Sequence, residues 1–121
     1  MHRSYALAGL IATSVAFASA ANAADTKTAS AALVESGHAF ALKVCWACHV
    51  VATDQTETPI LTHPAPSFLS IAQKPDLTAA ALRQFLSSHS QMLGSKNGMP
   101  NPQLADYQID EVVAYIESLK K

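Results

Sequence analysis

The sequence predicts an all-α fold built from about four helices. Apolar residues recur at three- and four-residue steps in several segments, and no run alternates apolar and polar residues as a half-buried strand does. The stretches between these segments are rich in Pro, Ser, Asn and Gly, which are typical of loops. With 121 residues and no internal repeat, the chain suits a single domain behind an export signal.

The first 23 residues have the pattern of that signal. Residues 1–5 carry Arg3 and no acid, residues 6–20 are apolar, and residues 21–23 form an A-x-A cleavage site. We expect cleavage after Ala23, which leaves residues 24–121 as the mature domain in the bacterial periplasm. The apolar stretch is short for a span, which needs about 20 residues, so we expect no stable membrane insertion once it is removed. A retained segment would act as an anchor.

The first helix is expected to follow a polar lead, residues 24–30, and to deliver the chain to Cys45. Apolar or small residues recur along it at helical spacing, which is the pattern of an amphipathic helix facing a core. This stripe consists of Leu33, Gly37, Phe40, Ala41 and Val44.

The middle of the chain is predicted to hold an irregular loop and two short helices. Residues 50–66 contain three prolines and show no periodicity, so they form the loop. Ser67 is expected to cap a short helix that runs through Gln73 and is ended by Pro75, and Thr78 is expected to cap the next one. The apolar face of this second helix consists of Leu82, Phe85 and Leu86.

The last helix follows a further loop over residues 87–103 and has the clearest pattern. Its apolar residues fall at i, i+3, i+4, i+7 and i+10, which places them on one face. They are Ile109, Val112, Val113, Ile116 and Leu119. Acidic residues lie near its start, and Lys120 and Lys121 close its end, an order that complements the helix dipole.

The run Cys45-Trp46-Ala47-Cys48-His49 is the strongest chemical signal, because C-x-x-C-H is the attachment motif of c-type haem. Two thiols three residues apart in a helical turn can reach both vinyl groups on one edge of a porphyrin, while the next residue directs an imidazole at the iron. One covalently bound haem c is therefore the expected cofactor, held by Cys45, Cys48 and His49. A large apolar cofactor would also complete the small core of an alanine-rich domain.

The two cysteines have three alternative uses. A structural disulfide is possible in an exported protein. A thioredoxin-like redox pair would need strands alternating with helices, which the sequence lacks, and a zinc site would need further ligands at suitable spacing.

A haem iron with one imidazole needs a second axial ligand, which decides whether the site carries electrons or binds small molecules. We expect Met99, because Gly98-Met99-Pro100-Asn101 is a stiff segment just before the last helix. The other candidates are Met92, His63, His89 and His38, of which His38 is expected to be a solvated surface residue. A His/Met pair raises the reduction potential and leaves no open coordination position, so an electron carrier is favoured over an enzyme. An open position would instead favour a gas sensor or peroxidase.

The sequence resembles the class I cytochromes c of bacteria from Ala32 to Leu119. Besides the C-x-x-C-H run, Gly37 matches the small residue of the family's first helix, and residues 112–115 match its terminal-helix signature. The resemblance implies that these two helices cross closely. It also implies that Pro66 supplies a carbonyl to the Nδ1 hydrogen of the haem-ligating histidine, which strengthens the ligand. Phe68, Phe85 and Leu86 are expected to line the haem pocket.

The chain departs from the family in three ways. Ala65-Pro66 replaces the usual Gly-Pro, Phe40 stands one residue before the mitochondrial aromatic, and the lysine ring of mitochondrial relatives is missing. With a formal charge of −1, or −2 without Arg3, the chain also lacks the basic patch that nucleic-acid binding requires. We expect redox proteins as donor and acceptor. The leading hypothesis is a monomeric electron shuttle. The alternative is a haem subunit of a periplasmic dehydrogenase or oxidase complex.

Overall fold

The structure is a computed structural model that describes residues 19–88 and 98–121, with side chains at residue 27 and from residue 30 onward. Four helices occupy this part of the chain: α1 (Ser19–Val44), α2 (Phe68–Ala72), α3 (Ala79–Ser87) and α4 (Asp106–Ser118). The described residues contain no strand, only one isolated parallel bridge between His49 and Ala65. The predicted all-α fold is confirmed.

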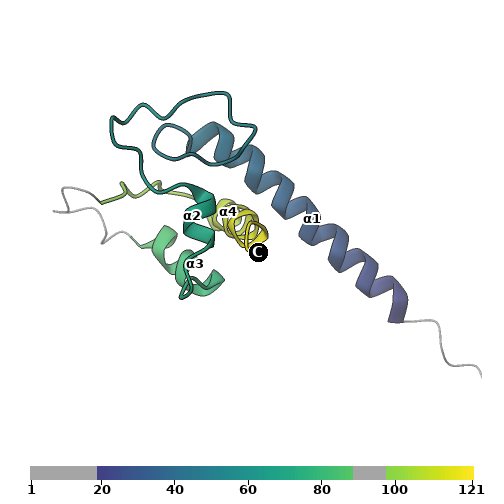
Figure 1. Cartoon of the computed structure of the whole chain (residues 1–121). Coiled ribbons are helices and arrows are strands. Elements are labelled where there is room, and N and C mark those ends of the chain that lie inside the picture. Colours follow the sequence, from purple (N-terminus) through teal and green to yellow (C-terminus); the bar gives the residue numbers. More distant parts are fainter. Residues whose placement is uncertain (1–18, 89–97) are drawn as a thin grey trace, which may run out of the picture.

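Helix α4 is the centre of the packing, because α1, α2 and α3 all contact it (Figure 1). Its buried face matches the predicted apolar stripe at Ile109, Val112, Val113 and Ile116, but it also includes Tyr115, and Leu119 is only half-buried. At its start the side chain of Gln108 accepts a hydrogen bond from the backbone N–H of Ala105, 2.9 Å away, which satisfies one of the donors that a helix end leaves free. The buried core residues that gather around α4 are Ala41, Val51, Phe68, Ala72, Leu82, Leu86, Ile109, Val112, Val113, Tyr115 and Ile116.

Helix α1 differs from the prediction at its start and in the face that it buries. It begins at Ser19, well before the expected polar lead ends. Leu33 and Val44, which were placed on the apolar stripe, are exposed, whereas Val34 packs against the core. The reason is that the contact with α4 centres on Gly37, so the residues one turn away on its own face, Val34 and Ala41, meet α4 instead.

The crossing of α1 over α4 depends on Gly37. A Cβ atom built on Gly37 would collide with the backbone carbonyl of Glu111, 2.6 Å from its carbon, and would lie 2.9 Å from Cβ of Tyr115. Atoms that are not bonded do not pack this closely, so only a residue without a side chain fits. The close crossing that the family resemblance implied is therefore present.

The two short helices begin where the capping residues predicted. Ser67 Oγ accepts from the backbone N–H of Ser70 at 3.1 Å, and Thr78 Oγ1 accepts from that of Ala81 at the same distance. In α3, Leu82 and Leu86 are buried as expected. Phe85, the third residue of the predicted apolar face, is exposed. It lies one residue off the i, i+4 line that Leu82 and Leu86 follow toward α4.

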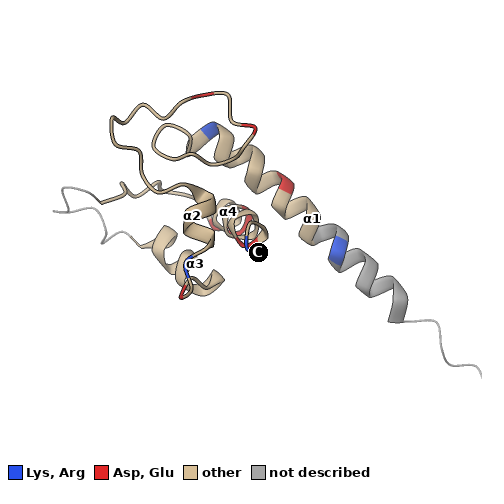
Figure 2. Ribbon diagram, in the orientation of Figure 1, with Lys and Arg blue, Asp and Glu red and all other residues tan. Residues whose placement is uncertain are grey.

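Charged residues are spread along the described part of the chain and form no basic stripe (Figure 2). Lys120 extends back from the end of α4, where its ammonium group donates to the carbonyl of Leu77 at 2.9 Å and pairs with Glu117. Among the described helices, none is both long and apolar enough to cross a membrane.

Candidate functional site

The site begins where α1 ends, because the C-x-x-C-H run folds into one further turn. The backbone N–H of Cys45 donates to the carbonyl of Ala41 at 2.9 Å, and those of Cys48 and His49 both donate to the carbonyl of Cys45, at 3.2 and 3.0 Å. The helix thus supports the turn from one side, and both thiols and the imidazole come from the five residues 45–49 of that turn. Both cysteines are half-buried and are not joined in a disulfide.

The Cys45 thiol does not have the character of a redox-active thiol. Its burial raises its pKa to about 11, and the neighbouring Cys48 adds to the rise. Cysteines that attack disulfides have lowered pKa values, because the thiolate is the nucleophile. The surroundings of Cys45 are therefore not those of an attacking thiol.

His49 is held with one ring nitrogen occupied. The residue is only 8% exposed, and its Nδ1 lies 2.7 Å from the carbonyl oxygen of Pro66. A carbonyl can only accept, so Nδ1 carries the proton and donates. In the neutral ring Nε2 then bears the lone pair, which is the form that ligates a metal. This donor set fits haem iron.

Two backbone hydrogen bonds fix the approach of Pro66 to His49. The N–H of Ala65 donates to the carbonyl of Cys48, and the N–H of Phe68 donates to the carbonyl of Val50, both at 2.9 Å. The ring of Phe68 then stands edge-on to the imidazole, with centroids 5.5 Å apart. The loop that the prolines predicted thus returns to the attachment turn and closes over its histidine.

Met99 comes from a separate segment, just before α4. Its side chain is half-buried and packs against the apolar core. The segment is stiff, since Pro100 and Pro102 fix two backbone torsions. Gln103 adopts a positive φ of 51°, with its N–H bound to the side chain of Asn101 at 2.8 Å.

The other proposed axial ligands are placed differently. His63 is exposed in the loop, and Met92 and His89 lie outside the described residues. His38 is not the solvated residue that was expected: its side chain is 31% exposed, its Nε2 donates to Asp54 at 2.9 Å, and its ring stands 5.1 Å from that of Tyr115. The approach of Tyr115 and of the 50–54 segment to α1 covers this face of the helix.

Sequence reasoning missed two interactions behind the attachment turn. One is the pair of His38 and Asp54, and the other is a buried hydrogen bond of 2.9 Å from the hydroxyl of Tyr115 to the carbonyl of Val51. The second pair is separated by 64 residues, and no spacing rule relates them.

A helical domain that presents two thiols and a buried imidazole on one turn is built for covalently attached haem. The sequence matches the model of the cytochrome c family over residues 34–120, so the chain belongs to the cytochrome c family, as a class I c-type cytochrome. It is 32% identical over 100 residues to a cytochrome c-552 of Bradyrhizobium diazoefficiens, an alignment that covers 81% of this chain and 88% of the relative. No solved structure matches it.

Membership of this family settles the cofactor. Haem c is covalently attached in the family, and Cys45 and Cys48 fit its C-x-x-C-H motif. The chain is thus a monohaem cytochrome that carries electrons, and the family indicates an electron-transfer protein rather than an enzyme.

Proposed function

We propose that this cytochrome is a periplasmic carrier that moves single electrons between a donor protein and an acceptor protein, with His49 and Met99 as the axial ligands of its haem iron. The observation that carries the proposal is the hydrogen bond of 2.7 Å from His49 Nδ1 to the Pro66 carbonyl. It selects the ring form whose Nε2 can bind iron, and it makes that nitrogen more basic. When bound, the haem supplies a one-electron couple between Fe(III) and Fe(II).

The residues around His49 keep the imidazole in one orientation through both oxidation states. The ring is buried, contacts Phe68 edge-on and is tied to Pro66, so rotation would break a partly buried hydrogen bond. A site that does not rearrange needs little reorganisation when an electron arrives or leaves. This is a property of a carrier.

We assign the second axial position to Met99, which is the only methionine among the residues that the structure describes. Its half-buried side chain packs against the core that contains Phe68, whose ring contacts His49, and its segment is stiffened by Pro100 and Pro102. A thioether opposite an imidazole favours Fe(II) and raises the potential, and it fills the sixth position. Substrates and gases then find no open site, which favours electron transfer alone.

Export and partner choice complete the proposal. Residues 1–23 would direct the chain to the periplasm and be removed after Ala23, leaving residues 24–121. The remaining chain has two more acidic than basic residues, so a partner with a positively charged docking face would be attracted. A shuttle should stay monomeric and form small, short-lived interfaces.

The test is expression of the full chain in a bacterial periplasm with haem-maturation factors, followed by mass spectrometry and optical spectra. We expect a mass equal to residues 24–121 plus one haem. We also expect the weak near-infrared charge-transfer band of iron bound to methionine sulfur. Met99→Ala should abolish the band while covalent haem remains, and the matched variant Met92→Ala should keep it. A band that survives in Met99→Ala, or haem bound without the band in the wild type, would refute Met99 as the ligand. Absence of covalent haem would refute the proposal as a whole.

A further inference from the structure

We propose that Tyr115 is a positioning residue for the iron ligand: its side chain holds together the two chain segments that carry the donor and the acceptor of the His49–Pro66 hydrogen bond, and so sets the basicity of the imidazole. The inference rests on the proposed role of His49. It goes beyond that role because it assigns control of the site to a residue of α4 that does not belong to the attachment motif.

The first segment is held through Val51, two residues after His49. Val51 is only 1% exposed, and side chains satisfy both of its backbone polar groups. Its carbonyl accepts from the Tyr115 hydroxyl at 2.9 Å, and its N–H donates to the side-chain oxygen of Gln55 at 2.8 Å. Burial raises the pKa of Tyr115, and the charge of Asp54 adds to the effect, so the hydroxyl keeps the proton that it donates.

The second segment is held through Phe68, two residues after Pro66. The rings of Tyr115 and Phe68 have centroids 6.2 Å apart, and Phe68 in turn stands against the His49 ring. One side chain therefore contacts both segments, by its hydroxyl on the side of His49 and by its ring on the side of Pro66. A shift of Tyr115 changes the distance between donor and acceptor.

These contacts of Tyr115 matter because the two segments interact only weakly with each other. Two backbone hydrogen bonds join them, one of which belongs to the isolated bridge, and this is far less than a stable two-stranded ribbon needs. Helix α4 supplies the rigidity that they lack. Tyr115 itself cannot move away, since its Cβ lies at the tight crossing with Gly37 of α1.

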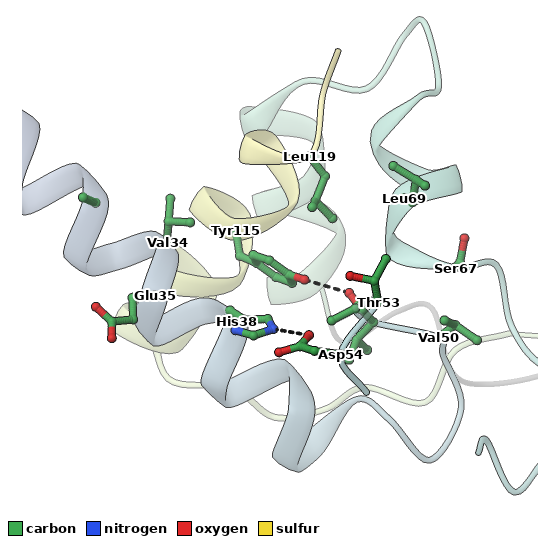
Figure 3. Close-up of a pocket in the computed structure, with 13 residues that line it drawn as sticks. Val34, Glu35, His38, Val50, Thr53, Asp54, Ser67, Leu69, Tyr115 and Leu119 are labelled. Atoms are coloured by element: carbon green, nitrogen blue, oxygen red, sulfur yellow. Dashed lines mark hydrogen bonds and ion pairs between the residues drawn. The ribbon is translucent and has the colours of Figure 1, made fainter. Parts of the chain in front are cut away.

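A second tether acts on the same loop from α1. Figure 3 shows both hydrogen bonds on the wall of an open cavity of about 520 Å³: Tyr115 reaches toward the segment that follows His49, and His38 binds Asp54. The rings of His38 and Tyr115 lie 5.1 Å apart. Residues 51–54 are thus held by both α1 and α4. Val51 in turn links these two helices to His49.

The consequence concerns the reduction potential. A strong hydrogen bond from Nδ1 makes the imidazole a better donor to iron, and a better donor favours the ferric state. If the contacts of Tyr115 are lost, the hydrogen bond from His49 to Pro66 weakens. The ferric state then loses stability, and the midpoint potential rises. The Nδ1 proton should also exchange faster with solvent, because the bond protects it.

The experiment compares the haem-loaded variants Tyr115→Phe and Tyr107→Phe with the wild type, after the optical spectrum has shown covalent haem in each. Tyr107 is the matched control, because it lies on the same helix and is 65% exposed. We measure the midpoint potential and, in the ferrous protein, the exchange rate of the His49 Nδ1 proton by ¹⁵N-edited NMR. Tyr115→Phe should raise both, and Tyr107→Phe should change neither.

A purely structural role would lower the stability of Tyr115→Phe but leave the potential and the proton exchange unchanged, and that result would overturn the proposal. If Tyr115→Phe does not bind haem, the variant Gln55→Ala provides the test instead, because the side chain of Gln55 also binds the backbone of Val51. This variant should raise both the midpoint potential and the exchange rate of the His49 Nδ1 proton. If it changes neither, the proposal is overturned. Missing haem in the wild type would instead refute the proposed function, so the two failures are distinguishable.

Discussion

Replacing Gly37 by alanine adds one methyl group at the point where α1 crosses α4. The new carbon would lie against the carbonyl of Glu111, 2.6 Å from its carbon, and 2.9 Å from Cβ of Tyr115. Neither neighbour can rotate away, because one is helix backbone and the other is the first atom of a buried side chain. The helices must therefore separate by about 1 Å, which loses a quarter to a half of the dispersion energy of the contacts involved.

The net effect is a loss of stability. Overpacking of this kind costs about 1–3 kcal/mol, and the better helix propensity of alanine returns about 1 kcal/mol. Because the obstacle is backbone, we take the upper part of the range and expect Gly37→Ala to lower the free energy of unfolding by ~1–2 kcal/mol.

Urea unfolding of the haem-loaded protein, followed by far-UV circular dichroism, measures this difference through the midpoint at constant slope. Ser36→Ala is the control, since residue 36 is exposed on the same helix and should change little. A Gly37→Ala variant as stable as the wild type would show that the crossing has room for a side chain, and would refute the reasoning.

Two further predictions concern acid stability and capping. The hydrogen bond from His38 holds the pKa of Asp54 below its ordinary value of 3.8, so the carboxylate stabilises the fold above that pH and the contribution is lost as the pH falls through the folded-state pKa. Asp54→Asn should therefore lose less stability than the wild type on acidification below about pH 4 in urea titrations, unlike the control Asp76→Asn. Thr78→Ala removes the cap of α3 and should cost about 1 kcal/mol in the same assay, with the exposed loop variant Thr62→Ala near zero. An equal acid response of wild type and Asp54→Asn, or a Thr78→Ala variant as stable as Thr62→Ala, would contradict them.

The residues that the sequence placed well all depend on near neighbours. The starts of α2 and α3 follow from Ser67 and Thr78, each of which binds an N–H three residues away. The buried face of α4 follows from helical spacing. Residues 45–49 carry their chemistry within one turn, so the attachment motif could be found without knowing the path of the chain.

The errors arose where a distant segment decides which face is covered. Leu33 and Val44 fit the stripe of α1 by spacing, yet α4 crosses at Gly37 and buries Val34 and Ala41. His38 lies beside that stripe and was expected in solvent. Its contacts with Asp54 and Tyr115 depend on how the loop after His49 returns along α1.

The sequence by itself determined the helical class, the capped short helices and the covalent haem chemistry, because hydrogen bonds and thiol spacing within a few residues specify them. The tertiary structure decided how His49 is held, although the family resemblance had already implied Pro66 as its partner. Its hydrogen bond to Pro66 spans 17 residues, and the bond from Tyr115 to Val51 spans 64. Contacts at such separations depend on how closely α1 and α4 approach, and that distance is set by packing at Gly37 rather than by any local preference of the chain.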